Sequence, residues 1–207
     1  MRRSTTLALR CPDCRLHRAL CVCAELPQVW TRTRVVLVLH QLEERKSTNT
    51  GRLAVRCLPN SVVVAHGRLP ATAATGRPIV DAAPYPWHSA PGPCVVLFPD
   101  ERARPIEDWR PSDALTLIAL DGTWSQAARA RRGFPGLAEL PSAVVPAGPP
   151  LHALRHDPRP GRLGTLEALG RALGALEGPD VQEPLERILR LVAERTWRTR
   201  GRAPVRR

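Results

Sequence analysis

A short apolar run, residues 115–120, does most to restrict the fold of this chain. Leu117, Ile118, Ala119 and Leu120 follow one another without a polar position between them. A run this brief indicates a β-strand rather than a helix, and its lack of alternation indicates a strand buried on both faces. Such strands belong to parallel sheets that helices cover on both sides, so the run predicts an α/β fold with a mostly parallel sheet.

The run ends in a polar turn, Asp121 to Trp124. Gly122 permits a tight turn, and Thr123 is expected to cap a helix that begins at Trp124. Asp121 then lies at the carboxyl end of a strand, which is where ligands bind in open α/β sheets. Two interpretations stay open for it, a ligand-binding group or a turn residue. Trp124 is likewise either a stacking surface beside the basic residues of its helix or part of the core.

Three other apolar runs follow the same plan, and each ends in a polar loop. They cover residues 35–39, 62–64 and 94–98. Parallel strands would bring these loops and Asp121 to one edge of the sheet, which is the predicted site. A further strand is expected at 143–145, and helices at 51–58, from 124 onward, at 166–176 with Thr165 as cap, and at 183–197. Residues 70–93 are rich in Pro, Ala and Gly and are expected to be mostly loop.

Four cysteines near the start of the sequence have the spacing of a zinc site. Cys11 and Cys14 form a Cys-x2-Cys pair around a small turn, and Cys21 and Cys23 form a second close pair. Four thiolates complete a tetrahedral site and leave no open position for a water molecule, so a zinc ion here would be structural. His17 is an alternative to one of these ligands.

Composition favours one main domain with an anionic partner. The chain has 207 residues, is 43% hydrophobic and carries 31 Lys and Arg against 19 Asp and Glu. The resulting net charge of +12 indicates nucleic acid as the partner. No apolar stretch approaches the ~18 residues of a membrane span and no signal sequence is recognisable, so a cytoplasmic protein without membrane contact is expected. The expected organisation is a basic tail with a zinc knuckle at 1–30, an α/β catalytic domain at 31–198 and a disordered basic tail at 199–207.

The motifs that the sequence lacks narrow the chemistry. There is no dinucleotide-binding fingerprint, no P-loop and no nucleophile elbow. Hydride transfer, nucleoside triphosphate hydrolysis and acyl transfer therefore have no positive support. A non-catalytic, zinc-containing RNA-binding protein is one alternative, but such a protein has no need for a pocket with acidic and aromatic residues.

Five short motifs follow one another along the chain. They are the cysteine cluster, His40-Gln41-Leu42-Glu43 with Thr48-Asn49-Thr50, Leu97-Phe98-Pro99-Asp100-Glu101, Asp121-Gly122-Thr123-Trp124, and Leu163-Gly164-Thr165-Leu166-Glu167-Ala168. In this order and spacing, over about residues 11–180, they resemble the DTW-domain family, the tRNA-uridine aminocarboxypropyltransferases. Gln41 departs from the family pattern, which has proline there, and the departure would relax that loop.

The resemblance implies a fold related to the knotted SPOUT methyltransferases, with S-adenosylmethionine as donor. It implies transfer of the 3-amino-3-carboxypropyl group to N3 of a tRNA uridine and release of 5′-methylthioadenosine. Because N3 carries an imide proton, a nearby carboxylate is the simplest activator, and Asp121 and Glu167 are the candidate catalytic residues. Asp121 has a rival role as the partner of the donor's amino group, and Glu167 as a partner of a helix dipole. A SPOUT-like RNA methyltransferase remains an alternative, and the oligomeric state, monomer or homodimer, stays open.

The resemblance and the charge distribution together give two further sets of candidates. The donor is expected to contact Leu97, Pro99, Asp100, Glu101, Asp121, Gly122, Thr123, Trp124 and Thr165. The tRNA is expected to contact His40, Glu43, Lys46, Thr48, Asn49, Thr50, Arg52, Arg129, Arg131, Arg132 and Arg155. Phosphate contacts of the second kind position an RNA without reading its sequence.

Overall fold

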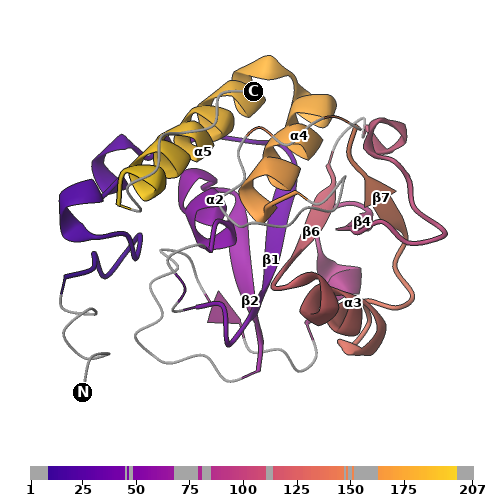
Figure 1. Cartoon of the computed structure of the whole chain (residues 1–207). Coiled ribbons are helices and arrows are strands. Elements are labelled where there is room, and N and C mark those ends of the chain that lie inside the picture. The colour runs from indigo at the N-terminus through magenta and orange to yellow at the C-terminus, as the bar shows by residue number, and fades with distance from the viewer. Residues whose placement is uncertain are drawn as a thin grey trace.

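The computed structural model describes residues 9–44, 46, 49–67, 79–80, 85–110, 114–146, 148, 151 and 163–199. Its strands are β1 (Arg34–His40), β2 (Ser61–His66), β3 (Ile79–Val80), β4 (Cys94–Leu97), β5 (Arg104–Pro105), β6 (Thr116–Asp121) and β7 (Ser142–Val144). They form one seven-stranded sheet in the order β3-β2-β1-β6-β4-β7-β5, with parallel neighbours throughout. This sheet confirms the predicted parallel α/β fold, and Figure 1 shows β2, β1, β6 and β4 side by side at its centre.

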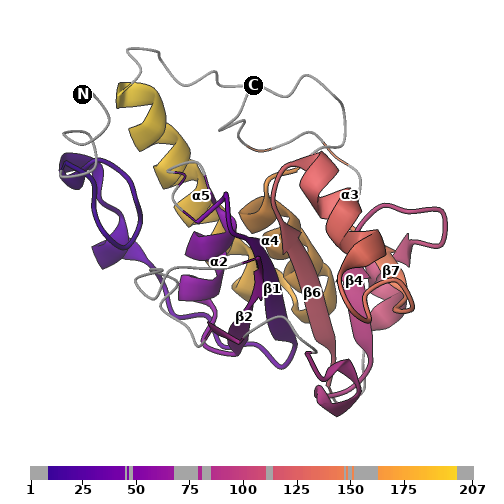
Figure 2. The same ribbon diagram turned by 90° about the horizontal axis from the view of Figure 1, so that it is seen from below.

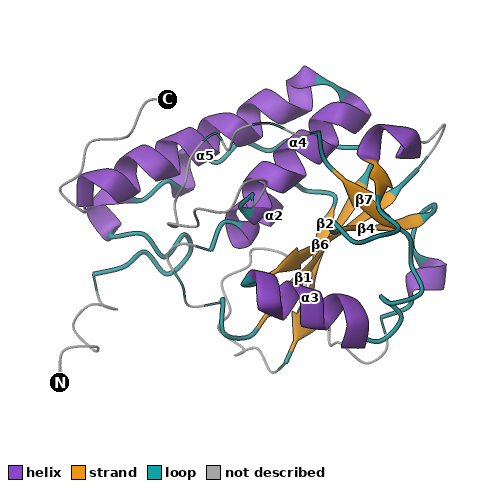
Figure 3. Ribbon diagram, turned by 45° about the vertical axis from the view of Figure 1, so that its right-hand side comes forward, coloured by secondary structure: helices purple, strands orange, loops and turns teal. Residues whose placement is uncertain are grey.

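The described helices flank the sheet in two layers. They are α2 (Gly51–Cys57), α3 (Trp124–Gly133), α4 (Thr165–Glu177) and α5 (Pro179–Thr199), with short 3₁₀ turns at Arg18–Leu20, Cys23–Glu25, Trp87–Ser89 and Ile106–Trp109. Figure 3 shows α2, α4 and α5 on one face of the sheet and α3 on the other. In the part of the chain that the structure describes, no helix is both long and apolar enough to cross a membrane.

Successive residues of the central strands face opposite helical layers, which is why their apolar runs show no polar face. Leu37 and Leu39 of β1 pack in the larger core, together with α2, α4 and α5. Val36 and Val38 pack in the smaller core, which Phe134 closes at the end of α3. Burial of both faces therefore holds β1 at the centre of the sheet.

Most predicted elements are confirmed to within a few residues, and the differences lie at their ends. Helix α5 begins at Pro179 rather than at residue 183, because Val181 is buried in the larger core and extends the helix before Pro184. The two-residue strand β5 was not predicted, since two residues carry no periodic signal.

The N-terminal segment packs against the sheet domain beside α2 and α5. Figure 2 shows this segment next to the C-terminal part of α5. Cys14 and Val22 are buried in the same core as α2, α4 and α5. The guanidinium of Arg195 in α5 donates to the carbonyl oxygen of Cys21 and to the carboxylate of Glu25. The cysteine-bearing segment is therefore joined to the domain by apolar and polar contacts.

Candidate functional site

The boundary between β1 and β6 is the point where the chain changes direction across the sheet. The chain leaves β1 through α2 toward β2 on one side, and it leaves β6 through α3 toward β7 on the other. In open α/β sheets, ligands bind outside the carboxyl ends of the strands at such a boundary. Leu39 and Asp121 are paired there, with His40 immediately beyond. The position of Asp121 at the end of β6 confirms the predicted strand end.

Asp121 is buried against the N-terminal ends of two helices. Its Oδ1 accepts a 2.7 Å hydrogen bond from the hydroxyl of Thr165, and its Oδ2 accepts one from the side-chain amide of Asn49. A Cβ atom on Gly51 would lie 2.6 Å from Oδ1, so only glycine permits this approach. The first residues of α2 and α4 thus surround the carboxylate, where the helix dipoles favour a negative charge.

The structure corrects the predicted role of Thr165 as a helix cap. Gly164 occupies the cap position of α4 without a side-chain hydrogen bond, and Thr165 is the first helical residue. The N–H of Leu166 instead donates to the hydroxyl of Thr50, at 3.3 Å. Because the loop before α2 satisfies the start of α4, the hydroxyl of Thr165 is directed to Asp121.

The Thr123 prediction, by contrast, is confirmed. Its hydroxyl accepts the N–H of Gln126 at 3.3 Å, and the Gln126 side chain accepts the N–H of Thr123 at 2.7 Å. This is a complete capping box at the start of α3. The cap of α3 is therefore Thr123, and Asp121 precedes the helix without capping it.

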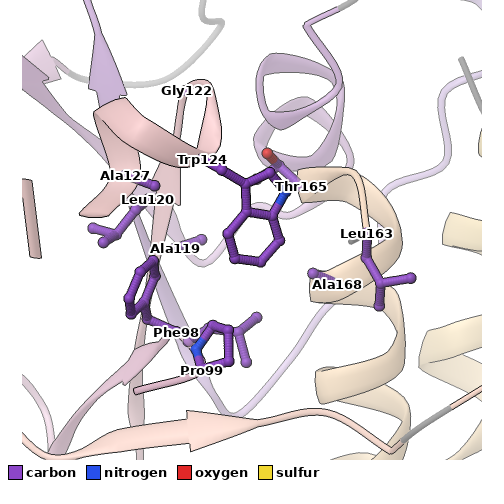
Figure 4. A pocket seen from close by; sticks show the side chains of 11 residues that line it. Phe98, Pro99, Ala119, Leu120, Gly122, Trp124, Ala127, Leu163, Thr165 and Ala168 are labelled. Atoms are coloured by element: carbon purple, nitrogen blue, oxygen red, sulfur yellow. The ribbon is translucent and has the colours of Figure 1, made fainter. Parts of the chain in front are cut away.

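A pocket of ≈ 80 Å³ opens beside Asp121, between α3 and α4. It is lined by Leu97, Phe98, Pro99, Ala119, Leu120, Gly122, Trp124, Ala127, Leu163, Thr165 and Ala168. Figure 4 shows the indole of Trp124 between Phe98 and Pro99 on one side and Ala168 on the other. The Phe98 and Trp124 ring centroids lie 6.1 Å apart. The volume is below the ~300–1,000 Å³ of typical small-molecule sites, so the described residues leave space for only part of a ligand, such as a flat ring.

The pocket includes five of the residues that were expected to contact the donor, namely Leu97, Pro99, Gly122, Trp124 and Thr165. The other four, Asp100, Glu101, Asp121 and Thr123, lie outside its lining, although Asp121 is bonded to the lining residue Thr165. The lining residues that the sequence did not single out as donor contacts are Phe98, Ala119, Leu120, Ala127, Leu163 and Ala168. Helical spacing was the available signal for two of them, because Ala127 lies three residues after Trp124, and Ala168 three after Thr165.

The residues expected to contact RNA fall into groups. Glu43, Asn49, Thr50, Arg52 and Arg131 are buried, His40 is half-buried, and Lys46, Arg129 and Arg132 are exposed; Thr48 and Arg155 lie outside the described residues. A buried side chain whose polar atoms bind protein groups does not contact an RNA phosphate. The exposed Lys46, Arg129 and Arg132 remain candidates for contacts with RNA phosphates.

Arg131 is a structural arginine rather than an RNA contact. Its guanidinium donates to Asp100 Oδ2 at 3.0 Å, to the carbonyl oxygen of Leu140 at 2.8 Å and to that of Leu137. The hydroxyl of Ser142 completes this group. Burial raises the pKa of Asp100, but the hydrogen bonds from Ser142 and Arg131 contribute to an opposite, larger effect, and its pKa lies below the usual value. Arg131 therefore holds the end of α3 against β7.

We expect Arg131→Met to lower the free energy of unfolding by roughly 2–3 kcal/mol, because it leaves several buried acceptors without their donor. The neighbouring Arg132 is exposed, so Arg132→Met should change stability by less than ~0.5 kcal/mol. Urea denaturation of the two variants provides the comparison. Equal stabilities would contradict the structural role of Arg131.

His40 lies on the α3 side of the same edge. Its Nδ1 accepts the N–H of Leu42 at 3.2 Å, and its ring meets that of His66 edge to face, with centroids 5.0 Å apart. Burial lowers the pKa of both histidines, and the nearby charge of Arg129 lowers both further. The lowered pKa favours the neutral form of both rings, and the hydrogen bond that His40 Nδ1 accepts from Leu42 fits the tautomer with its proton on Nε2.

Glu167, the second predicted catalytic carboxylate, is buried in α4. Its Oε1 accepts a 2.8 Å hydrogen bond from the N–H of Leu151 and a 2.6 Å one from Arg171. It lies outside the set of described residues that line the pocket. These contacts give Glu167 a structural task, which is to hold residue 151 against α4.

The four N-terminal cysteines form a group suited to one metal ion. Their sulfur atoms all lie within 4.8 Å of one another. The Sγ atoms of Cys11 and Cys23 are 3.7 Å apart, as are those of Cys14 and Cys21. A tetrahedral zinc site with Zn–S bonds of about 2.3 Å has sulfur atoms about 3.8 Å apart, so the spacing fits zinc. His17 lies outside this group, and its Nδ1 accepts the N–H of Ala19 at 3.3 Å.

The cysteine segment also favours deprotonation of one thiol. Burial raises the pKa of Cys11, but hydrogen bonds from the backbone N–H groups of Cys14 and Asp13 and from neighbouring thiols outweigh it, and the pKa falls to about 7. Burial raises the pKa of Cys23. Metal binding requires thiolates, and the lowered pKa of Cys11 favours its thiolate form.

The fold and the site define a parallel α/β protein with a pocket at the sheet edge where the chain changes direction. A segment with four cysteines suited to one metal ion packs beside it. Residues 8–196 match the family model for the DTW domain, and the chain belongs to this family. It is 28% identical over 189 residues to the Drosophila melanogaster protein named tRNA-uridine aminocarboxypropyltransferase 2, with 87% of this chain and 72% of that protein covered.

An Arabidopsis thaliana protein named tRNA-uridine aminocarboxypropyltransferase A is similar to the same extent. The identity is 27% over 218 residues, which cover 89% of this chain and 78% of the relative. No solved structure matches the chain significantly. The family match confirms the resemblance that the five sequence motifs indicate.

Proposed function

We propose that this protein transfers the 3-amino-3-carboxypropyl group of S-adenosylmethionine to N3 of a uridine in tRNA and releases 5′-methylthioadenosine. The observation that carries the proposal is the buried carboxylate of Asp121 beside a pocket that contains Trp124, at the edge of the sheet where ligands bind. The names of the two relatives support the same reaction.

The pocket residues divide into an apolar and a polar part. Trp124 and Phe98 offer flat surfaces on which the adenine of the donor can stack, and Ala168 leaves room beside them. The polar part is the hydroxyl of Thr165, which donates to the carboxylate of Asp121 next to the pocket lining. A carboxylate has about four acceptor positions, so its bonds to Asn49 and Thr165 are compatible with a further bond to a ligand.

The bound donor supplies an electrophilic methylene carbon next to its sulfonium. Uridine N3 forms a new bond to that carbon while the carbon–sulfur bond breaks, and the electron pair of the broken bond makes the sulfur neutral. N3 must also lose its imide proton. Asp121 is proposed to accept this proton, or alternatively to bind the ammonium group of the donor and direct the methylene carbon toward N3.

The proposal extends to the fold and to the metal. A relation to the SPOUT methyltransferases would include a knotted backbone near the donor site, and an experimental structure with the donor bound would test it. The four-cysteine segment is proposed to bind one structural zinc ion, which stabilises the segment and takes no part in group transfer.

The deciding experiment is incubation of the protein with S-adenosylmethionine and tRNA that lacks the modification. Mass spectrometry of the nucleosides should show a uridine heavier by the aminocarboxypropyl group, with one methylthioadenosine formed for each modified nucleoside. Release of S-adenosylhomocysteine would instead identify a methyltransferase. Binding of tRNA without either product would identify an RNA-binding protein.

We expect tRNA binding to weaken steeply with salt. The chain has a net charge of +12, and the exposed Lys46, Arg129 and Arg132 lie on elements that border the site. Each phosphate contact releases condensed counterions, so several contacts should lower affinity by ~10²-fold or more between 50 and 200 mM salt. Filter binding or fluorescence anisotropy measures this slope, and an affinity that is flat with salt would contradict a phosphate interface.

A further inference from the structure

Arg52, in the first turn of α2, is a fully buried arginine whose guanidinium contacts two separate parts of the chain. Its guanidinium donates to the carbonyl oxygen of Cys14 at 3.2 Å, to that of Lys46 at 3.4 Å and to that of Glu44. Cys14 belongs to the four-cysteine segment, whereas Lys46 and Glu44 belong to the loop that follows β1. One side chain therefore fastens this loop to the metal-binding segment.

The backbone of the same residue reaches the donor site. The N–H of Arg52 donates to Asn49 Oδ1 at 2.9 Å, and the side-chain amide of Asn49 donates to Asp121. This hydrogen bond sets the orientation of the Asn49 amide, because its oxygen and nitrogen cannot exchange places without losing both partners. A continuous series of contacts thus leads from Cys14 through Arg52 and Asn49 to Asp121.

A second contact joins the same two parts. Arg15, next to Cys14, has a φ of 62°, in the left-handed region that a non-glycine residue enters at a cost. Its guanidinium donates to Glu44 Oε1 at 2.6 Å, and the Glu44 side chain is buried. The backbone turn at Arg15 directs this side chain into the loop, so two arginines hold the loop against the cysteine segment.

The charge of Arg52 interacts with charged groups of the loop and of the site. Burial lowers its pKa to about 10, with a further lowering by Arg15 and opposing contributions from Glu44 and Asp121. The atoms that its nitrogens contact are backbone carbonyl oxygens. The charges near it are those of Glu44 and Asp121, which are opposite in sign, and that of Arg15, which is like in sign. A lysine would keep the charge but lose the planar fork that serves three carbonyl groups at once.

We infer that Arg52 is a positioning residue, which fixes the loop after β1 to the four-cysteine segment and thereby holds Asn49 on Asp121. The metal-bound segment, although remote from group transfer, then sets the geometry of the donor site. This role replaces the expected contact of Arg52 with RNA, from which its burial removes it. The inference rests on the proposed function only where S-adenosylmethionine affinity is measured.

The first test does not involve the donor. Amide hydrogen exchange is measured for residues 49–55 and 121–124 in the wild type with and without zinc, and in Arg52→Met, Arg52→Lys and Arg56→Met. Arg56 is the matched control, because it lies one turn further along α2 and also reaches the cysteine segment, at Asp13, 3.6 Å away. Peptides from α5 serve as the internal reference for global unfolding.

Arg52→Met and zinc removal should each accelerate exchange in the two segments by about tenfold relative to α5, and Arg56→Met by less than about twofold. If Arg52→Met fails to fold, Arg52→Lys and zinc removal from the wild type decide the question. Uniform acceleration in all segments, or equal effects at Arg52 and Arg56, would show that Arg52 only stabilises the fold and would overturn the inference.

The second test measures S-adenosylmethionine affinity by calorimetry on the same proteins. Zinc removal should weaken binding by about tenfold in the wild type, but by less than about twofold in Arg52→Met, which already lacks the connection. Effects of zinc removal and of Arg52→Met that simply multiply would overturn the inference. If zinc-loaded wild type does not bind the donor at all, the proposed function fails, while the exchange experiment still decides the role of Arg52.

Discussion

Asp121→Asn should lower turnover by ~10²-fold or more, the usual contribution of a general base. Asparagine has nearly the size of aspartate, but it can neither accept the N3 proton nor balance an ammonium group. It also offers one acceptor oxygen where Asp121 has two, which bind Asn49 and Thr165. Single-turnover rates with saturating donor and tRNA measure the effect.

Donor affinity separates the two proposed roles of Asp121. If it is the base, the affinity for S-adenosylmethionine should hardly change in Asp121→Asn. If it binds the ammonium group, affinity should fall together with the rate, since a charged hydrogen bond contributes ~1.5–3 kcal/mol. Calorimetric titration of the variant therefore accompanies the rate measurement.

Thr165→Val is the control for the loss of a hydrogen bond that positions the Asp121 carboxylate. It removes the 2.7 Å hydrogen bond to Asp121 and keeps the negative charge. We expect it to lower the rate by about tenfold, corresponding to one hydrogen bond of ~1.4 kcal/mol. An Asp121→Asn variant no slower than Thr165→Val would assign Asp121 to the structure of the turn rather than to the reaction.

Cys14→Ser should abolish stoichiometric zinc binding and lower the free energy of unfolding by ~3 kcal/mol or more. Structural zinc ions contribute folding free energy directly, with apparent binding energies of ~10–16 kcal/mol in small domains. Cys14 is buried with its sulfur in the four-cysteine group, so the smaller serine oxygen can neither fill the space nor replace a thiolate. Metal analysis and urea denaturation measure the two effects.

Cys57→Ser is the matched control, because Cys57 is equally buried but lies at the end of α2, outside the four-cysteine group. It should lower stability through the buried hydroxyl and leave one zinc ion per chain. Freshly purified wild type without zinc, or a Cys14→Ser variant that retains it, would contradict the proposed metal site.

The sequence by itself determined the layer structure and the edge of the sheet that carries the candidate site. Fully apolar runs such as residues 35–39 have no face suited to water, so helices must cover both sides and the strands must be parallel. Parallel strands bring their carboxyl ends together, so the sequence alone predicts that His40 and Asp121 lie at one edge, as they do. The capping box at Thr123 and the four-cysteine group were also readable, because both depend on spacing within a short segment.

Only the tertiary structure decided which polar residues belong to the interior. Arg52 and Arg131 are buried, whereas Arg129 and Arg132 are exposed. All four are arginines among other basic residues, and the local sequence does not indicate which of them is buried. The burial of the first two depends on carbonyl groups from distant segments, such as that of Cys14 for Arg52. Contacts with distant segments also explain why Thr165 donates to Asp121 and does not cap α4. A hydrogen bond between residues far apart in sequence leaves no periodic pattern in the chain, so the fold had to be known before these partners could be named.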